Sequence, residues 1–152
     1  MAAGDLAAAR GHYQASLDIR ERLAAADPSN AGWQRDLSVS RQRLGEAAAA
    51  AGDLAAARGH YQAGLDIAER LAAADPGNAG WQRDLSVSHE RLGDMASAAG
   101  DLATARTHHQ AGLDIAERLA AADPSNAEWQ RDLSTVHQKI TDLDSTSGAK
   151  EA

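Results

Sequence analysis

One histidine recurs at equivalent positions along the chain, as His12, His60 and His108. Imidazole side chains bind metal ions and transfer protons near neutral pH, so a repeated histidine could mark a metal site. Successive copies lie 48 residues apart, however (60 − 12 and 108 − 60), and no carboxylate or cysteine lies at ligand spacing within the same helix. Adjacent side chains such as His108 and His109 point about 100° apart on a helix and cannot easily hold one ion. We therefore predict no metal and no cofactor, and we assign these histidines to surface or boundary positions.

Three tryptophans, Trp33, Trp81 and Trp129, recur at the same spacing. Tryptophan is enriched at binding hot spots, so these side chains could anchor a ligand. Each one lies at the start of a predicted amphipathic helix, on its apolar stripe, where a residue normally belongs to the core. Packing beneath a neighbouring hairpin is the favoured interpretation, and ligand anchoring is the alternative.

The chain carries no recognisable catalytic motif. It has no Ser-His-Asp set, no phosphate-binding loop and no metal-binding histidine pair. Arg-Asp pairs recur at 35–36, 83–84 and 131–132, but adjacent residues cannot face each other on one helix, so these side chains are expected to be solvated or to pair between repeats. An enzyme needs a polar constellation in a pocket, and so regular a repeat offers no special place for one. We predict that the protein is not an enzyme.

The composition narrows the range of partners. The chain has 152 residues, a formal net charge of −7 and no cysteine. An acidic surface repels phosphate groups, which argues against nucleic acid and anionic membranes as partners. No apolar stretch approaches the roughly 20 residues that a membrane span needs. The N-terminal residues do not resemble a signal peptide, so a cytoplasmic location is expected.

A unit of 48 residues occurs three times, marked by Gly-Asp-Leu at 4–6, 52–54 and 100–102. The first two units, 4–51 and 52–99, are nearly identical, and the third keeps the pattern until about Leu133. A fixed period of this size indicates stacked supersecondary units that are stabilised by their neighbours.

Each unit contains two predicted helices. Asp53 is a suitable N-cap, and its helix is expected to stop at Asp75-Pro76 because proline cannot continue a helix. The next helix is expected to start at Asn78 and to end at Gly100, which can adopt the left-handed conformation. Short connections make neighbouring helices antiparallel. The predicted fold is therefore all-α, with six helices in three antiparallel hairpins at about 5–51, 53–99 and 101–144 and a polar, disordered tail at 145–152.

The small and aromatic residues of these hairpins resemble the tetratricopeptide repeat (TPR). The matching residues are Leu44-Gly45, Ala48, Gly52-Asp53, Ala57, Tyr61, Gly64-Leu65 and Pro76. They recur as Leu92-Gly93, Ala96, Gly100-Asp101, Ala105, His109, Gly112-Leu113 and Pro124. The resemblance covers nearly the whole chain and implies one solenoid domain over 1–144 with a right-handed superhelix. The usual unit has 34 residues, so this chain resembles a long-helix, bacterial-type variant.

The two ends depart from the family pattern. His109 replaces the aromatic residue at Tyr61, and Ile140-Thr141 replaces the Leu-Gly pair, so the last helix resembles a capping helix. Because the chain enters the pattern at Gly4-Asp5, the first helix has a flank that a preceding unit would cover. The chain is therefore expected either to be an excerpt of a longer array or to dock this flank on another copy.

The resemblance also implies a concave groove lined by the first helix of each family unit. The partner-binding residues that it implies are Gln42, Glu46, Ala49, Glu90, Asp94, Ser97, Gln138 and Asp142. Several of them differ between units, which fits either partner selection or the drift of exposed positions. Some family members grip a peptide carboxylate with Lys and Asn at these positions, whereas this chain carries Glu, Asp and Gln. A basic or small-polar protein partner is therefore expected.

These observations favour a non-catalytic protein–protein interaction scaffold or adaptor that binds a peptide or partner helix in an acidic groove. The alternative is a structural module that self-assembles, as a dimer or end to end, through the uncovered first helix. A homo-oligomer would follow from the alternative.

Overall fold

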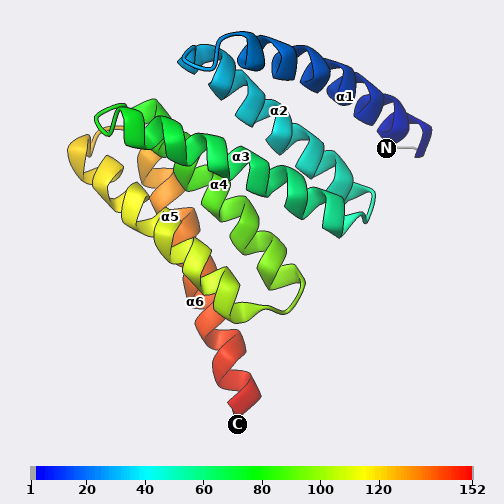
Figure 1. Ribbon diagram of the computed structural model, residues 1–152. Helices are drawn as coiled ribbons and strands as arrows, with labels where there is room; N and C mark the ends of the chain where they lie inside the picture. The colour runs from blue at the N-terminus through cyan, green and yellow to red at the C-terminus, as the bar shows by residue number, and fades with distance from the viewer. Residues whose placement is uncertain (1–2, 152) are drawn as a thin grey trace. The chain divides into compact units, whose positions relative to one another are not determined.

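The computed structural model describes residues 3–151, and over these residues it contains six α-helices and no strand (Figure 1). The helices are α1 (Ala3–Ala26), α2 (Ala31–Ala50), α3 (Leu54–Ala74), α4 (Ala79–Ala98), α5 (Leu102–Ala122) and α6 (Ala127–Glu151). The predictions of an all-α fold and of six helices are confirmed. None of the helices in the described part of the chain is both long and apolar enough to cross a membrane.

The helix ends follow the capping residues that the sequence predicts. The Asp53 carboxylate accepts a hydrogen bond of 3.1 Å from the Ala56 amide, and the Asn78 side chain accepts one of 3.1 Å from the Trp81 amide. Gly52 and Gly100 adopt φ angles of +79° and +78°, which turn the chain out of α2 and α4. A side chain at either position would be strained, because left-handed backbone disfavours a Cβ.

The chain divides into two compact units, Met1–Asp75 and Pro76–Ala152. In unit 1, α2 packs against both α1 and α3. In unit 2, α5 packs against both α4 and α6. We call α2, α4 and α6, which begin at the recurring Asn-Ala pairs, the first-type helices, and we call α1, α3 and α5 the second-type helices. The boundary between the units falls between α3 and α4. The predictions of one continuous domain over 1–144 and of a hairpin at 53–99 therefore stay predictions.

Small residues bring the first-type and second-type helices close together. A Cβ added to Gly45 would lie 2.5 Å from the Tyr61 ring, and one added to Gly93 would lie 2.5 Å from the His109 ring. Next to these contacts, the Ser38 hydroxyl donates a hydrogen bond of 2.9 Å to the Gly64 carbonyl. Each unit therefore contains the same close helix pair, α2 with α3 and α4 with α5.

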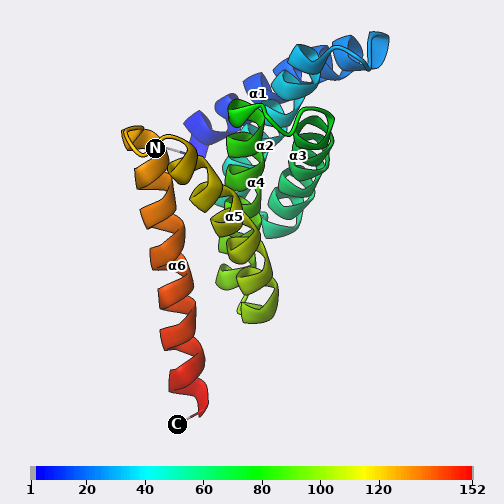
Figure 2. The ribbon, with the colours of Figure 1, turned by 90° about the vertical axis from the view of Figure 1, so that its left-hand side faces the viewer.

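The last helix is longer than the sequence pattern indicates. It was expected to end near residue 144, but α6 continues to Glu151, and its last turns extend beyond α5 (Figure 2). The Ser145 and Thr146 hydroxyls donate to the carbonyls of Thr141 and Asp142, four residues earlier, at 3.1 and 2.9 Å. The segment contains no proline, so its exposed polar residues remain in a helix. The last residue of the predicted tail, 152, lies outside the described residues.

Candidate functional site

The predicted groove residues of unit 1 lie on α2. Gln42, Glu46 and Ala49 are all half-buried. The Glu46 carboxylate lies 3.4 Å from the Arg43 guanidinium, one turn away on the same helix. This acidic group is therefore partly compensated within its own helix.

In unit 2, a lysine joins the groove residues of α4 to α6. The Lys139 ammonium lies 2.5 Å from the Glu90 carboxylate and 2.8 Å from the Asp94 carboxylate. Lys139, which neighbours Gln138 in the chain, was not among the residues predicted from the sequence. The predicted acidic character of Glu90 and Asp94 is therefore offset by a cation from the neighbouring first-type helix.

The remaining groove residues of unit 2 differ in exposure. Gln138 and Asp142 on α6 are exposed, and the Gln138 amide donates a hydrogen bond of 2.8 Å to the Asp142 carboxylate. Ser97 on α4 is half-buried. Asp142 is thus the most exposed of the predicted groove carboxylates of unit 2.

A second ion pair joins α4 to α6 near their N-terminal ends. Nε of Arg83 donates to the Asp132 carboxylate at 2.7 Å, and the Arg83 guanidinium lies 3.0 Å from Glu128. The hydrogen bond to Asp132 raises the pKa of Arg83. For Arg83 and Asp132, the expectation that the repeated Arg and Asp residues pair between repeats is confirmed.

Unit 2 also contains a histidine cluster between α4 and α5. Nδ1 of His89 lies 3.1 Å from Nδ1 of His108, and burial, followed by the nearby His108, lowers the pKa of His89 to about 4. His109 is 1% exposed, its Nδ1 has no hydrogen-bond partner, and burial lowers its pKa. Among the described residues, no three or more His, Cys, Asp or Glu side chains form a group that could hold a metal ion.

The repeated histidines agree with their predicted surface or boundary positions. His12 is exposed, whereas His60 and His108 are half-buried. In unit 1, the Arg41 guanidinium lies 3.5 Å from Nδ1 of His60. Arg41 of α2 and His89 of α4 are equivalent positions, so the first contacts His60 and the second contacts His108.

The outer side of α1 exposes apolar residues that the other copies bury. Tyr13, Ile19 and Leu23 are 39%, 52% and 39% exposed. The equivalent residues of the other second-type helices are all buried: Tyr61, Ile67, Leu71, His109, Ile115 and Leu119. The flank that the repeat frame leaves uncovered is thus an exposed apolar surface in the structure.

A cleft of about 230 Å³ in unit 1 adjoins this surface. We call its lining the open face: Tyr13, Ser16 and Arg20 from α1, and Val39, Ser40 and Arg43 from α2. The guanidinium of Arg20 donates to the hydroxyls of Ser16 and Ser40, both at 2.6 Å. The uncovered flank of α1 was predicted from the repeat frame, but the roles of Ser16 and Arg20, which stand where the other two copies carry Gly and Ala, were not.

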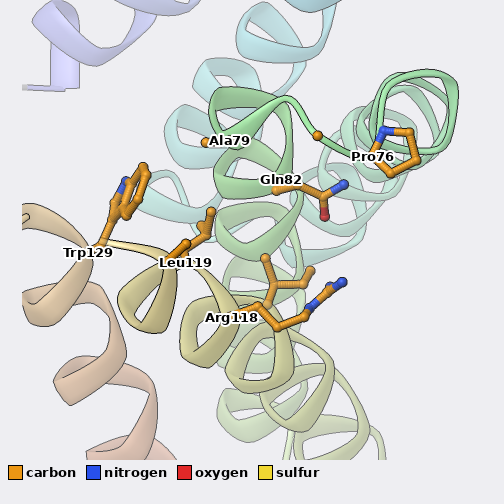
Figure 3. A pocket seen from close by; sticks show the side chains of 9 residues that line it. Pro76, Ala79, Gln82, Arg118, Leu119 and Trp129 are labelled. Carbon is orange, nitrogen blue, oxygen red and sulfur yellow. The ribbon is translucent and has the colours of Figure 1, made fainter. Parts of the chain in front are cut away.

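A second cleft, of about 280 Å³, lies in unit 2. In Figure 3, Trp129 and Leu119 line one side of this cleft, and Gln82 and Arg118 line the other. Its volume falls below the roughly 300–1,000 Å³ that is typical of small-molecule sites. All three tryptophans are half-buried. They are thus neither fully buried in a core nor fully exposed as a ligand anchor would be.

No protein-family model and no curated protein matches the chain.

Proposed function

We propose that the chain is a non-catalytic protein-interaction scaffold built as a tetratricopeptide-like solenoid. The observation that carries the proposal is a contrast within the repeat. The contacts that hold the helices together recur in both units, as in the hydrogen bonds from Ser38 to Gly64 at 2.9 Å and from Ser86 to Gly112 at 3.0 Å. The polar surface of the first-type helices changes from copy to copy instead. A constant framework that presents a variable polar surface suits partner recognition.

Within unit 2, the surface that we propose for partner binding centres on α6. Asp142 and Gln138 are exposed there, next to Lys139 and its two carboxylate partners. A peptide or helix with basic or small polar side chains would find acceptor oxygens on this surface. Lys139 limits the attraction, because it already compensates Glu90 and Asp94.

Panning a displayed random-peptide library against the full chain tests this proposal. Selected peptides are expected to lose binding to an Asp142→Lys/Gln138→Lys variant. They should keep binding to an Arg58→Glu variant, which changes an exposed charge on α3. Peptides that bind the wild type and the Asp142→Lys/Gln138→Lys variant equally well would refute a role for this surface.

A second candidate function is association through α1. The specific observation is the exposure of Tyr13, Ile19 and Leu23, whose counterparts are buried in both other copies. Exposed apolar side chains that cluster on one helix face mark interaction surfaces.

Light scattering after size exclusion, over a wide concentration range, tests homotypic association. The mass is expected to rise with concentration, and an Ile19→Lys/Leu23→Lys variant is expected to stay monomeric. A wild-type chain that remains monomeric at every concentration would exclude homotypic association through this face.

A further inference from the structure

Unit 2 shows what covers the pair formed by a second-type helix and the first-type helix that follows it. There, α4 contacts both α5 and α6. Gly93 of α4 lies against the His109 ring, and the Ser86 hydroxyl donates to the Gly112 carbonyl at 3.0 Å. Glu90 and Asp94, one turn apart on α4, both reach Lys139 of α6.

In unit 1, the equivalent pair is α1 with α2, and no described helix of unit 1 occupies the position that α4 occupies in unit 2. Positions correspond at a separation of two repeats, or 96 residues: Tyr13 to His109, Ser16 to Gly112 and Arg43 to Lys139. The Arg43 side chain is 61% exposed, whereas that of Lys139 is 25% exposed. The open face is therefore the uncovered counterpart of a contact that exists in unit 2.

The charges on α2, in and beside the open face, match this contact over two helical turns. Asp132, which pairs with Arg83 of α4, corresponds to Asp36 of α2, and Asp36 is exposed. Asp36 and Arg43 thus offer an anion and a cation seven residues apart. On α4, Arg83 and Glu90 have the same separation and the complementary charges.

Two residues unique to the first copy change the chemistry of this face. Arg20 replaces an alanine and brings a second guanidinium, which the hydroxyls of Ser16 and Ser40 hold in place. Ser16 replaces a glycine, but a Cβ at the equivalent Gly112 would lie 3.4 Å from the nearest atom of α4, which is an ordinary contact. The open face is therefore more basic than its covered counterpart.

We propose that the open face binds an acidic α-helix that carries the contact residues of α4. Such a helix has an arginine, a glutamate seven residues later, and a glycine and an aspartate three and four residues after that glutamate, as in Arg83, Glu90, Gly93 and Asp94. The two carboxylates would bind Arg43, as Glu90 and Asp94 bind Lys139, the glycine would pack on Tyr13, and the arginine would pair with Asp36. This inference rests on the second candidate function and names the chemistry of the partner.

The probe is a peptide of residues 79–98, acetylated and amidated, titrated into the full-length ¹⁵N-labelled chain. A free helix of this length is only marginally stable in water, so weak binding is expected and NMR is the suitable method. Amide signals of residues 13–20 and 36–43 should shift. A peptide of residues 127–146 is the matched control, because Gln138 and Thr141 replace the glutamate and the glycine.

Charge reversal sharpens the test. Arg43→Glu should weaken binding of the 79–98 peptide at least about tenfold, the equivalent of about 1.4 kcal/mol, because it removes an attraction and adds a repulsion. A peptide with Glu90→Lys and Asp94→Lys should recover binding to the Arg43→Glu chain. Arg58→Glu changes the net charge equally and should leave binding unchanged.

Three results would overturn the proposal: no shifts at millimolar peptide, equal binding of the 79–98 and 127–146 peptides, or equal weakening by Arg43→Glu and Arg58→Glu. Concentration-dependent mass that Arg43→Glu does not alter, together with no peptide binding, would refute the acidic-helix partner and leave association through α1 in place. Peptide binding by a strictly monomeric chain would support the acidic-helix partner and exclude homotypic association.

Discussion

Helices α1 and α5 occupy the same position in the repeat but have different surroundings. In its unit, α5 packs against α4 and α6, and Ile115 is 5% exposed. In its unit, α1 packs against α2, and the equivalent Ile19 is 52% exposed. The same apolar residues of a repeat helix are therefore buried or exposed according to which helices pack beside it.

Some of the residues that distinguish the copies lie on α1 and α6. Ser16 and Arg20 place polar groups on α1 at positions where the other copies have Gly and Ala. Thr141 stands in α6 at the position of Gly45 and Gly93, where a Cβ comes within 2.5 Å of an aromatic or imidazole ring. The Thr141 side chain is thus incompatible with a close second-type helix of the kind that follows α2 and α4.

The largest predicted effect is a difference in stability between alanine substitutions at Ile115 and at Ile19. Ile115→Ala should lower the free energy of unfolding by about 2–5 kcal/mol, because it leaves a cavity under a buried side chain. Ile19→Ala should change it by less than about 0.5 kcal/mol, because the residue is already 52% exposed. Urea denaturation followed by circular dichroism measures both variants.

The Ile19→Ala result also reports on association. If Ile19→Ala proved as costly as Ile115→Ala, α1 would be covered in solution, and the comparison between the two helices would fail. Repeating the denaturation at several protein concentrations would then identify a self-associated state, because association makes stability depend on concentration.

The next prediction concerns the close approach of α4 to α5. Gly93→Ala should destabilise the chain by about 1–3 kcal/mol, because its Cβ would meet the His109 ring at 2.5 Å and the helices would have to move apart. Gly59→Ala is the matched control, since a Cβ there has nothing within 4 Å. An alanine in that helix interior should add about 0.5–1 kcal/mol. Equal effects at the two positions would show that close packing at Gly93 is not needed.

A third prediction uses the histidine cluster, which unit 1 lacks. The pKa of His89 is lowered to about 4 by burial and by His108. In the unfolded chain, this histidine takes up a proton near the ordinary histidine pKa of about 6.5. In the folded chain, it takes up the proton only at lower pH. The contribution of His89 is complete above about pH 6.5 and is lost as the pH falls toward 4.

This loss should amount to about 1–2 kcal/mol, less than the full shift would give, because the ring is partly in solvent. His89→Gln should flatten the dependence of unfolding free energy on pH in this window. His12→Gln removes an exposed histidine of α1 and is the control. A wild-type profile that His89→Gln leaves unchanged would show that the cluster does not resist protonation.

The sequence predicted the elements of this fold better than their contacts. The caps at Asp53 and Asn78 and the turns at Gly52 and Gly100 depend on a few adjacent residues, so local chemistry was sufficient. The helical continuation to Glu151 was missed because the polar composition of this segment was taken to indicate disorder. In the structure, its hydroxyl groups bond to carbonyl oxygens of the same helix.

The charge state of the candidate site could not be predicted in the same way. Glu90 and Asp94 were expected to attract a basic partner, but Lys139 comes from another helix, and only tertiary structure brings the three together. The open face was partly predictable, because the repeat frame leaves the flank of the first helix uncovered. The changes at Ser16 and Arg20 were the available signal for its chemistry, and they became meaningful only beside the covered face of unit 2.

The smallest predicted effect compares the two equivalent cations, Lys139 and Arg43. Lys139→Gln should cost about 0.5–1 kcal/mol, because it leaves the carboxylates of Glu90 and Asp94 facing each other without a cation. Arg43→Gln should change stability by less than about 0.5 kcal/mol, because Glu46, its carboxylate partner among the described residues, lies 3.4 Å away on an exposed surface. Both effects should shrink in 1 M salt, where the Debye length falls to about 3 Å. An Arg43→Gln variant as destabilised as Lys139→Gln at low salt would mean that the open face is already covered in the free chain. Equal losses of stability in the two variants would then indicate that an acidic helix already packs on α1 and α2 before any partner is added.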